Sequence, residues 1–377
     1  MKTASDIQVL VLEGSPRERG QIHGEALRPV ILEYIGRWKN HLQESMGMDP
    51  NEYIEQFTQE TDFLAAIKRW TPDLLEEVRG IAEGSGVNFG TIFANQLGDE
   101  EWVYRRHKKL ALASQKTDRC SSLGVFGQRE IPPLAAQNMD VPDYYDDFQI
   151  LLHIKHPDSA LESFVFTTAG LIALNGLNNQ PVSICCNTLL QLDHAIDGLP
   201  VAFIVRGVLA QPTQADAAAF IQRIKHASGQ NYIIGGSQTI LDFECSADQV
   251  CQFVPYPGAN RVYHTNHPLV NNDQDFFQQI IKKLSPEEKQ QADKGQANTL
   301  ARFDFLESQL RDESQTITVE KIKTILSSHE APVCVDRKKE KGKSLTLGCL
   351  IMELSPSPVL HIAPGPPCST EFKTFTL

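Results

Sequence analysis

The sequence predicts an α+β protein in which antiparallel sheets are covered by helices. The chain changes character near Cys120: helical patterns predominate before it, and short β-rich segments alternate with pairs of helical stretches after it. Runs of strands interrupted by paired helices are typical of layered α+β proteins. With 377 residues, of which 41% are hydrophobic, the chain can bury a large core as one big domain or as two ordinary ones.

Three helical stretches are expected before Cys120. In the first, Ser15 is placed to cap a helix with Pro16 at its first position, and Thr71 and Pro72 repeat this arrangement in the second. Glycines close to the end of the second stretch are typical of a helix C-terminus. The expected helices cover residues 15–42, 71–87 and 88–110.

The segments after Cys120 carry the strand signals. They are short, rich in β-branched and aromatic residues, and bounded by turn residues. Strands are expected at 121–127, 133–141, 148–156, 161–170, 182–189, 231–238, 240–246, 249–256, 261–267 and within 343–364. Two pairs of helices interrupt them, at 201–210 with 214–227 and at 296–310 with 318–329.

Composition and charge argue against several classes of protein. The net charge is −12 and no basic patch with interleaved aromatic residues is present, so nucleic acid is a poor candidate partner. No apolar run reaches the length of a membrane span, and the N-terminal one is too short for a signal peptide; a cytoplasmic protein without membrane contact is expected. Eight cysteines in a chain this long are too few for a disulfide scaffold, and reduced, mostly buried thiols are expected.

Familiar catalytic and metal-binding patterns are largely missing. His264 and His267 have an H-x-x-H spacing, but no carboxylate or thiol stands at metal-ligand spacing and on a strand the two would point to opposite faces, so no metal is expected. The vicinal cysteines 185 and 186 are most simply part of the core. Neither a dinucleotide-binding nor a nucleotide-phosphate motif is present. A nucleophile–base pair of Cys120 and His264 stays open as an alternative.

Cys120 stands in the stretch TDRCSSL, where small hydroxyl residues follow it. The residues alone leave three interpretations open: a buried thiol, half of a disulfide, or a nucleophile that acts once the chain is cut in front of it. An N-terminal cysteine carries its own base, because an α-amino group titrates at about 7.7–8.0 and is partly neutral near pH 7. The thiol can expose that amine itself by attacking the preceding carbonyl, which gives a thioester that water hydrolyses.

Six stretches, in this order, point to one family. They are GSPRERGQIHGEAL, LLEEVRGIAEGSGV, DRCSSL, AAQNMD, GLNNQPVSICCNTL and VYHTNHPL, and the helix pair LPVAFIVRGVLAQPTQADAA lies between the last two. Almost end to end, the chain resembles the penicillin acyltransferase family of N-terminal-nucleophile hydrolases, the acyl-coenzyme A:6-aminopenicillanate acyltransferase group.

The resemblance implies a four-layer αββα sandwich and an autocatalytic cleavage between Arg119 and Cys120. A helical segment 1–119 and a β-rich catalytic segment 120–377 would then stay associated as one compact unit. Such a protein is made as an inactive precursor and acts through the thiol of the new N-terminal cysteine.

The resemblance also implies roles for individual residues. Asp140 falls on the family's strand aspartate and is expected to orient the new α-amino group. Asn266 falls on the asparagine of the H-T-N-H segment and is expected to donate to the oxyanion that acyl transfer generates. Weaker candidates for the substrate pocket are Gln137, Met139, Asn178, Asn187 and His264.

Four departures from the family pattern bear on processing and substrate. Arg119 stands where glycine is frequent, which would slow self-cleavage, and Met139 replaces a common tryptophan. Gln137 replaces the arginine of related bile-acid hydrolases, which argues against conjugated bile acids. The stretch GKSLTLG lacks the arginine that follows G-K-S in the penicillin enzyme, which argues against a penicillin substrate.

The expected activity is hydrolysis of a small N-acyl compound, or transfer of its acyl group to an amine, through an acyl-Cys120 thioester. No cofactor is expected, although acyl-coenzyme A is a candidate acyl donor. The expected partner is a small amide or thioester, and a homo-oligomer is left open. Two other classes stay open as alternatives: an uncleaved, ligand-binding pseudoenzyme, and a cysteine peptidase that depends on His264 or His267.

Overall fold

The computed structural model describes residues 7–109, 120–157, 159–336 and 344–377, and within them the strands form two sheets. The eight-stranded sheet has the order β1 (Gln8–Leu12), β4 (Gln149–Lys155), β5 (Glu162–Thr168), β6 (Asn175–Asn178), β7 (Ser183–Thr188), β8 (Gln230–Gly235), β9 (Ile240–Cys245) and β10 (Val250–Gln252). The six-stranded sheet has the order β11 (Arg261–His264), β2 (Ser121–Val125), β3 (Leu134–Pro142), β12 (Ser344–Glu353), β13 (Val359–Ala363) and β14 (Lys373–Thr376).

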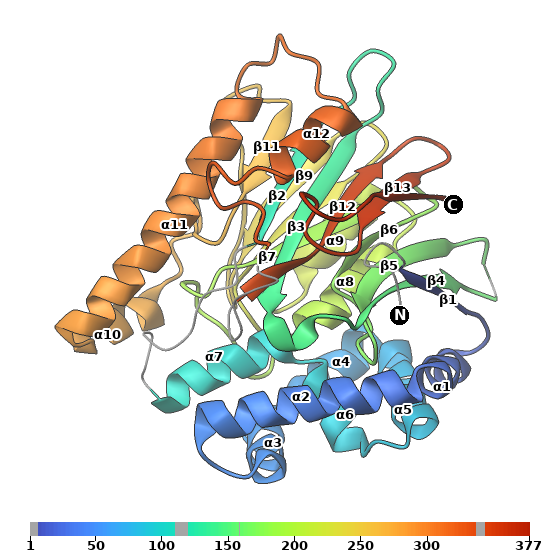
Figure 1. Ribbon diagram of the computed structural model, residues 1–377, viewed down its shortest axis with the longest axis vertical. Coiled ribbons are helices and arrows are strands. Elements are labelled where there is room, and N and C mark those ends of the chain that lie inside the picture. Colours follow the sequence, from blue (N-terminus) through green and yellow to red (C-terminus); the bar gives the residue numbers. More distant parts are fainter. Residues whose placement is uncertain (1–6, 110–119, 158, 337–343) are drawn as a thin grey trace.

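The two sheets pack face to face between two layers of helices. Strands β2 and β3 contact β7 and β8 across the interface, and all described strand pairs are antiparallel except β1 with β4. Helices α8 (Val201–Leu209) and α9 (Gln214–Arg223) cover the eight-stranded sheet. Helices α11 (Pro286–Leu310) and α12 (Val319–Leu326) cover the six-stranded one (Figure 1). The predicted four-layer αββα sandwich is confirmed.

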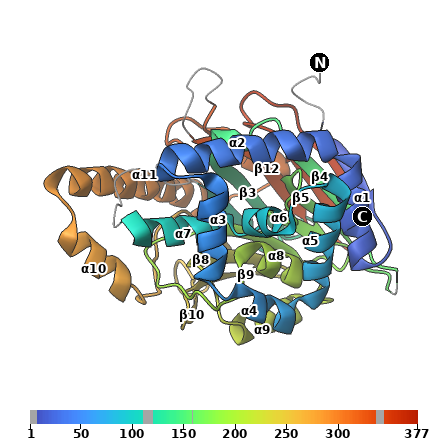
Figure 2. The same cartoon turned by 90° about the horizontal axis from the view of Figure 1, so that it is seen from below.

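The helices of the N-terminal segment gather at one end of the sandwich, as Figures 1 and 2 show from two directions. They are α1 (Pro16–Ala26), α2 (Arg28–Met46), α3 (Pro50–Gln59), α4 (Phe63–Trp70), α5 (Pro72–Ser85), α6 (Phe89–Asn95) and α7 (Gly98–Lys109). Ser15 caps α1 as predicted, in a capping box with Glu18. Thr71 precedes α5, but its side chain makes no capping hydrogen bond there.

Two predicted helices are each divided in two. The stretch 15–42 breaks at Leu27, because Pro29 cannot donate a backbone hydrogen bond and therefore fits only the first turn of a new helix. The stretch 88–110 breaks between α6 and α7. Helices α3, α4 and α10 (Asp275–Lys283) were not predicted.

Two hydrophobic clusters fill the layers. The larger one contains residues of the N-terminal helices, of both sheets and of α8 and α9. The smaller one lies between the six-stranded sheet and α11 and α12. Strand β1 pairs with β4, so the N-terminal segment also contributes a strand to the eight-stranded sheet.

A buried ion-pair cluster links the N-terminal segment to α8. Arg206 donates to both carboxylate oxygens of Glu77, at 2.6 and 3.0 Å, and Arg19 donates to the same group at 3.2 Å. All three side chains are buried. Removing one partner of such a cluster leaves an uncompensated buried charge, so the cluster ties α1 and α5 firmly to α8.

Glycines allow α1 and α5 to cross in backbone contact. A Cβ on Gly20 would lie 2.0 Å from the Glu77 carbonyl oxygen, and one on Gly80 would lie 2.1 Å from the Arg17 carbonyl oxygen. Gly24 and Gly84 make the same kind of approach one turn further along. The close crossing therefore explains why Gly20 and Gly24 occur in the first family-like stretch and Gly80 and Gly84 in the second.

This crossing gives the first prediction. Gly80→Ala should destabilise the protein by about 3 kcal/mol in urea-induced unfolding, because its methyl group meets backbone rather than a movable side chain. Gly36→Ala is the matched control, since a Cβ there meets nothing within 4 Å on an exposed face of α2. It should be neutral or stabilising by about 0.5–1 kcal/mol. Equal effects of the two substitutions would contradict the tight crossing.

Candidate active site

Cys120 lies at the start of β2, inside the sandwich. Its Sγ is 3.6 Å from the Sδ of Met139 and 3.8 Å from the carbonyl oxygen of Asp140, both on the neighbouring strand β3. The residue is 3% exposed. Arg119, the other side of the predicted cleavage point, lies outside the described residues.

A cavity of about 50 Å³ adjoins the Cys120 thiol. Most of its walls are apolar, and its polar residues are Asp99, Asp140 and Thr188. Its apolar lining comes from Trp102, Met139, Val141, Tyr145, Ala173, Leu174, Cys186, Val201, Ala202 and Val205. The space next to the thiol therefore suits a small apolar group.

Asp140 is held by the strand on the other side of β3. The Thr346 hydroxyl on β12 donates to Asp140 Oδ1 at 2.6 Å and accepts from the Val335 amide at 2.9 Å. A break in the β3–β12 register between Thr346 and Gly348 lies beside this contact. Asp140 is fully buried, and it lines the same cavity as Cys120.

Asn266 follows β11 and is oriented from both ends. Its backbone amide donates to the Thr299 hydroxyl at 2.9 Å, and its side-chain nitrogen donates to the Thr188 carbonyl oxygen at 3.1 Å. Its side-chain oxygen accepts from Arg302 at 2.9 Å. Because a guanidinium only donates, this contact fixes which end of the amide is nitrogen. One of the two N–H groups on that nitrogen binds the Thr188 carbonyl oxygen.

Arg302, which was not predicted from the sequence, joins the predicted residues. Its Nη1 donates to the Cys120 carbonyl oxygen at 2.6 Å and to the Ser121 hydroxyl at 3.1 Å, while Nη2 reaches Asn266. Arg302 is 1% exposed on α11. A signal was present: the buried residues of α11 are 299, 302, 306 and 310, so this arginine stands on the apolar face.

Gln137 forms part of a polar network between the sheets. Its side-chain oxygen accepts from Asn175 at 2.9 Å and from the Cys186 amide at 3.2 Å, and its nitrogen donates to Asn187 at 3.2 Å and to the Cys186 carbonyl. Asn187 in turn donates to the carbonyl oxygens of His264 and of residue 265. Neither Gln137 nor Asn187 lines the Cys120 cavity.

Asn178 lies away from the cavity, in the β6–β7 hairpin. Its side-chain oxygen accepts from the amides of Gln180 and Val182, and its nitrogen donates to the carbonyl oxygens of Leu209 and Gln211, each at 2.9–3.0 Å. These bonds close the hairpin and attach it to the end of α8. Among the predicted pocket residues, Met139 is the one that lines the cavity.

His264 is engaged on both ring nitrogens. Nε2 contacts Glu244 at 2.9 Å and Nδ1 contacts the Thr265 carbonyl oxygen at 2.8 Å. Burial lowers the pKa of His264, but the hydrogen bond to Glu244 and the nearby carboxylates outweigh burial and raise it. His267 contacts the hydroxyls of Thr265 and Thr299. Both imidazoles are thus committed to groups other than the Cys120 thiol.

Two neighbouring acids lie at the start of α7: Asp99 is half-buried and lines the cavity, and Glu100 is buried. Asp99 accepts from the Thr188 hydroxyl at 2.8 Å, which connects it to the residue that binds Asn266. Glu100 accepts from the Ser228 hydroxyl at 2.7 Å. Burial and the neighbouring Asp99 raise the pKa of Glu100 to about 7, and burial raises the pKa of Asp99.

The comparisons place these residues in a family. The model of the family Acyl-coenzyme A:6-aminopenicillanic acid acyl-transferase matches residues 129–365, more than half of the chain. The chain belongs to this family. The matched range contains Asp140, Asn266 and Arg302, and it begins after Cys120. No curated protein matches the chain.

Solved structures that are similar to the chain share little sequence with it. A Caenorhabditis elegans N-acylethanolamine-hydrolyzing acid amidase ortholog has 16% identity and a TM-score of 0.42, over 68% of this chain and 100% of that one. A mutant conjugated bile acid hydrolase from Clostridium perfringens has 11% identity and a TM-score of 0.40, and the match covers 68% of this chain and 97% of that one. A penicillin V acylase from Agrobacterium tumefaciens has 9% identity and a TM-score of 0.41, and the match covers 68% of this chain and 86% of that one.

No helix in the described part of the chain is both long and apolar enough to cross a membrane.

The raised pKa of Glu100 gives a prediction about stability. Between the ordinary pKa of 4.5 and about 7, the folded protein keeps a proton on Glu100 that the unfolded chain has lost, so stability falls as pH rises through this window. Urea unfolding should show the wild type losing about 2 kcal/mol more than Glu100→Gln between pH 5.5 and pH 8.5. The exposed control Glu55→Gln should keep the wild-type difference; the same pH dependence in Glu100→Gln would refute the assignment.

Proposed function

We propose that the chain is an acyl-transferring enzyme that uses Cys120 as nucleophile and is activated by cleavage between Arg119 and Cys120. One observation carries the proposal. A single buried guanidinium, that of Arg302, binds both the Cys120 carbonyl and the Asn266 side chain, while the thiol faces a small apolar cavity bordered by Asp140. A thiol and a carboxylate that share a cavity, together with an amide linked to the thiol-bearing residue through Arg302, are components that acyl transfer needs.

Activation begins with the same thiol. The Cys120 sulfur attacks the carbonyl carbon of Arg119, the carbon–nitrogen bond breaks, and the amide nitrogen of Cys120 takes the thiol proton. Water then hydrolyses the resulting thioester, giving a carboxylate on Arg119 and an α-amino group and a thiol on Cys120. No oxidant or cofactor enters this sequence.

Catalysis reuses the thiol with its own amine as base. The neutral α-amino group accepts the thiol proton, and the thiolate attacks the carbonyl carbon of the substrate. The free N–H of Asn266 donates to the oxygen that becomes negative. Asp140 favours the charged form of the amine and thereby orients it, since its own carboxylate is fixed by Thr346.

The acyl group of the substrate is inferred from the cavity. Its walls are mostly apolar and its volume is small, which favours a small apolar acyl group on an amide or a thioester. The acyl-Cys120 thioester then reacts with water or with an amine, and hydrolysis ranks slightly ahead. Acyl-coenzyme A is the candidate donor for transfer.

After cleavage, the segments 1–119 and 120–377 are proposed to stay together. Strand β1 pairs with β4, and Glu77 binds Arg206, so a strand and a buried ion-pair cluster both join the two segments. Neither contact involves the bond that is cut.

Processing is predicted to depend on the thiol. By proportion of the 42.0 kDa chain, cleavage before Cys120 gives fragments of roughly 13 and 29 kDa. Cys120→Ala should stay a single 42.0 kDa chain on a denaturing gel. Cys251→Ser, which changes a thiol on β10 outside the site, should be cut like the wild type. If the Cys120→Ala protein is cut normally, self-processing by this thiol is wrong. If the wild type stays uncut, the result favours the ligand-binding pseudoenzyme.

The role of Asn266 is tested by kinetics. A panel of N-acyl amines and acyl thioesters is first screened by mass spectrometry for an adduct on Cys120. With the best substrate, Asn266→Ala should lower kcat by about two to three orders of magnitude with little change in KM, because the lost donor acts on the transition state. The control His267→Asn should keep kcat within about threefold. The reverse result, a large loss with His267→Asn alone, would support a Cys–His peptidase.

A further inference from the structure

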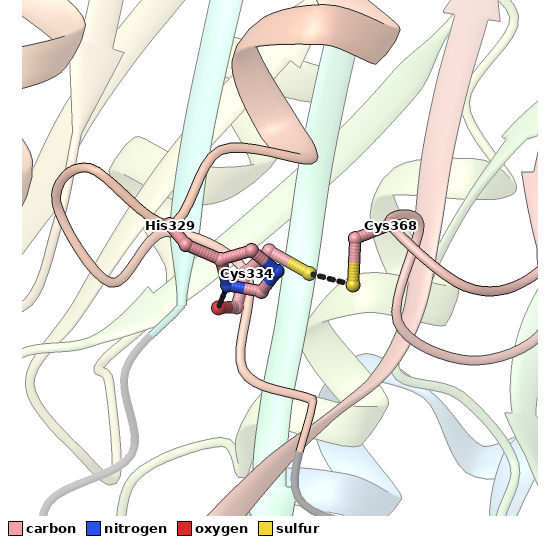
Figure 3. Close-up of side chains that lie close together, drawn as sticks. All are labelled: His329, Cys334 and Cys368. Carbon is pink, nitrogen blue, oxygen red and sulfur yellow. Dashed lines mark hydrogen bonds between the residues drawn. The ribbon is translucent and has the colours of Figure 1, made fainter.

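A second group of reactive side chains lies apart from Cys120. His329, Cys334 and Cys368 each offer a ligand atom, and these atoms all lie within 4.8 Å of one another (Figure 3). His329 and Cys334 lie in the segment after α12, whereas Cys368 lies between β13 and β14. His329 and Cys368 are exposed and Cys334 is buried. Two segments that are distant along the chain therefore meet at three strong metal ligands.

The imidazole is already oriented for coordination. Its Nδ1 contacts the Cys334 carbonyl oxygen at 3.1 Å, and because a carbonyl only accepts, this nitrogen carries the proton. In the neutral ring the lone pair then resides on Nε2, and Figure 3 shows the second ring nitrogen on the side of the sulfur atoms. Metal-binding histidines commonly donate their other N–H to a backbone carbonyl in this way.

The spacing of the sulfur atoms suits a shared ion. The Sγ atoms of Cys334 and Cys368 are 3.3 Å apart. Two thiolates on one tetrahedral zinc ion, each at about 2.3 Å, lie about 3.8 Å apart, whereas a disulfide requires about 2.05 Å. A small outward movement of the two sulfur atoms would therefore bring them to the separation of two thiolates on one zinc ion. The Asp336 carboxylate, with Oδ2 at 3.9 Å from Cys368 Sγ, provides an oxygen for the fourth position.

We propose that His329, Cys334 and Cys368 bind one divalent cation of the zinc class, with Asp336 or water as fourth ligand. Two sulfurs, one imidazole and one oxygen form a donor set that selects zinc over magnesium or calcium. Binding converts both thiols to thiolates and releases two protons, and no oxidation is involved. The bound cation takes no part in the acyl-transfer chemistry.

The position of this site suggests a structural role. Val335, between the ligands Cys334 and Asp336, exchanges backbone bonds with Thr346: its amide donates to the Thr346 hydroxyl at 2.9 Å and its carbonyl accepts from the Thr346 amide at 3.0 Å. The same hydroxyl donates to Asp140. A metal at Cys334 would hold this segment against Cys368 and so support Asp140 from behind.

The test uses the full chain, reduced, freed of metal by a chelator, and titrated with Co²⁺. Wild-type protein should bind one equivalent and develop the visible absorption of tetrahedral cobalt together with a near-ultraviolet thiolate-to-cobalt band. One equivalent of Zn²⁺ should displace the cobalt and raise Tm by at least about 3 °C, because a ligand that binds only the folded state stabilises it.

Two substitutions at exposed ligands keep the fold intact and make the test specific. Cys368→Ser and His329→Ala should each weaken Co²⁺ binding by at least about 100-fold, and Cys368→Ser should also weaken the thiolate band. Cys251→Ser, which removes a thiol elsewhere, should bind like the wild type. Failure of the reduced wild type to take up Co²⁺ would overturn the site, as would unchanged binding in Cys368→Ser. If the protein kept in air is lighter by the mass of two hydrogen atoms, and the reduced protein takes up no metal, Cys334 and Cys368 form a disulfide instead.

Discussion

The candidate active site depends on one buried cation. Arg302 donates to the Cys120 carbonyl, the Ser121 hydroxyl and the Asn266 side chain, and these three acceptors are neutral. Burying a guanidinium costs several kcal/mol unless its donors are satisfied, so the position of α11 and the start of β2 fix each other. Thr299, one turn earlier on the same helix, binds the Asn266 backbone amide. One helix face therefore sets the positions of both Cys120 and Asn266.

Around this contact, the sheets are held together by polar groups as well as by apolar packing. Gln137 on β3 bonds Asn175, Asn187 and the Cys186 backbone across the interface. Each of these bonds has a specific partner, and a one-residue slip of either sheet would leave buried amides without theirs. The network thus fixes the register in which β3 presents Met139 and Asp140 to Cys120. Buried polar residues between two sheets can thus position other residues without lining the cavity themselves.

The sequence was most informative where chemistry depends on short motifs. Cys120, Asp140 and Asn266 came from three separate stretches, and the fold brings the first two within 3.8 Å and links the third through Arg302. The layered fold followed from strand and helix periodicity. For Arg302 the sequence indicated only its place on the apolar face of α11, in register with Leu306 and Leu310. Its partners could not be predicted, because they are distant in sequence. The contact between His264 and Glu244 could not be predicted either, because Glu244 lies on another strand and gives no local signal.

The proposed activation requires little rearrangement, because the contacts that hold Cys120, Asp140 and Asn266 lie on the C-terminal side of the bond that is cut. Arg302 binds the carbonyl of Cys120, which belongs to the bond after it, so cleavage before Cys120 leaves this contact intact. The same holds for the Thr346–Asp140 bond and for the Thr188–Asn266 bond, all within the catalytic segment. On the Cys120 side of the cut bond, the nitrogen changes from an amide that cannot act as a base to an amine that can. The precursor would therefore already carry the oxyanion donor and the carboxylate in place, and the thiol that opens its own peptide bond would meet the next acyl carbonyl in the same surroundings.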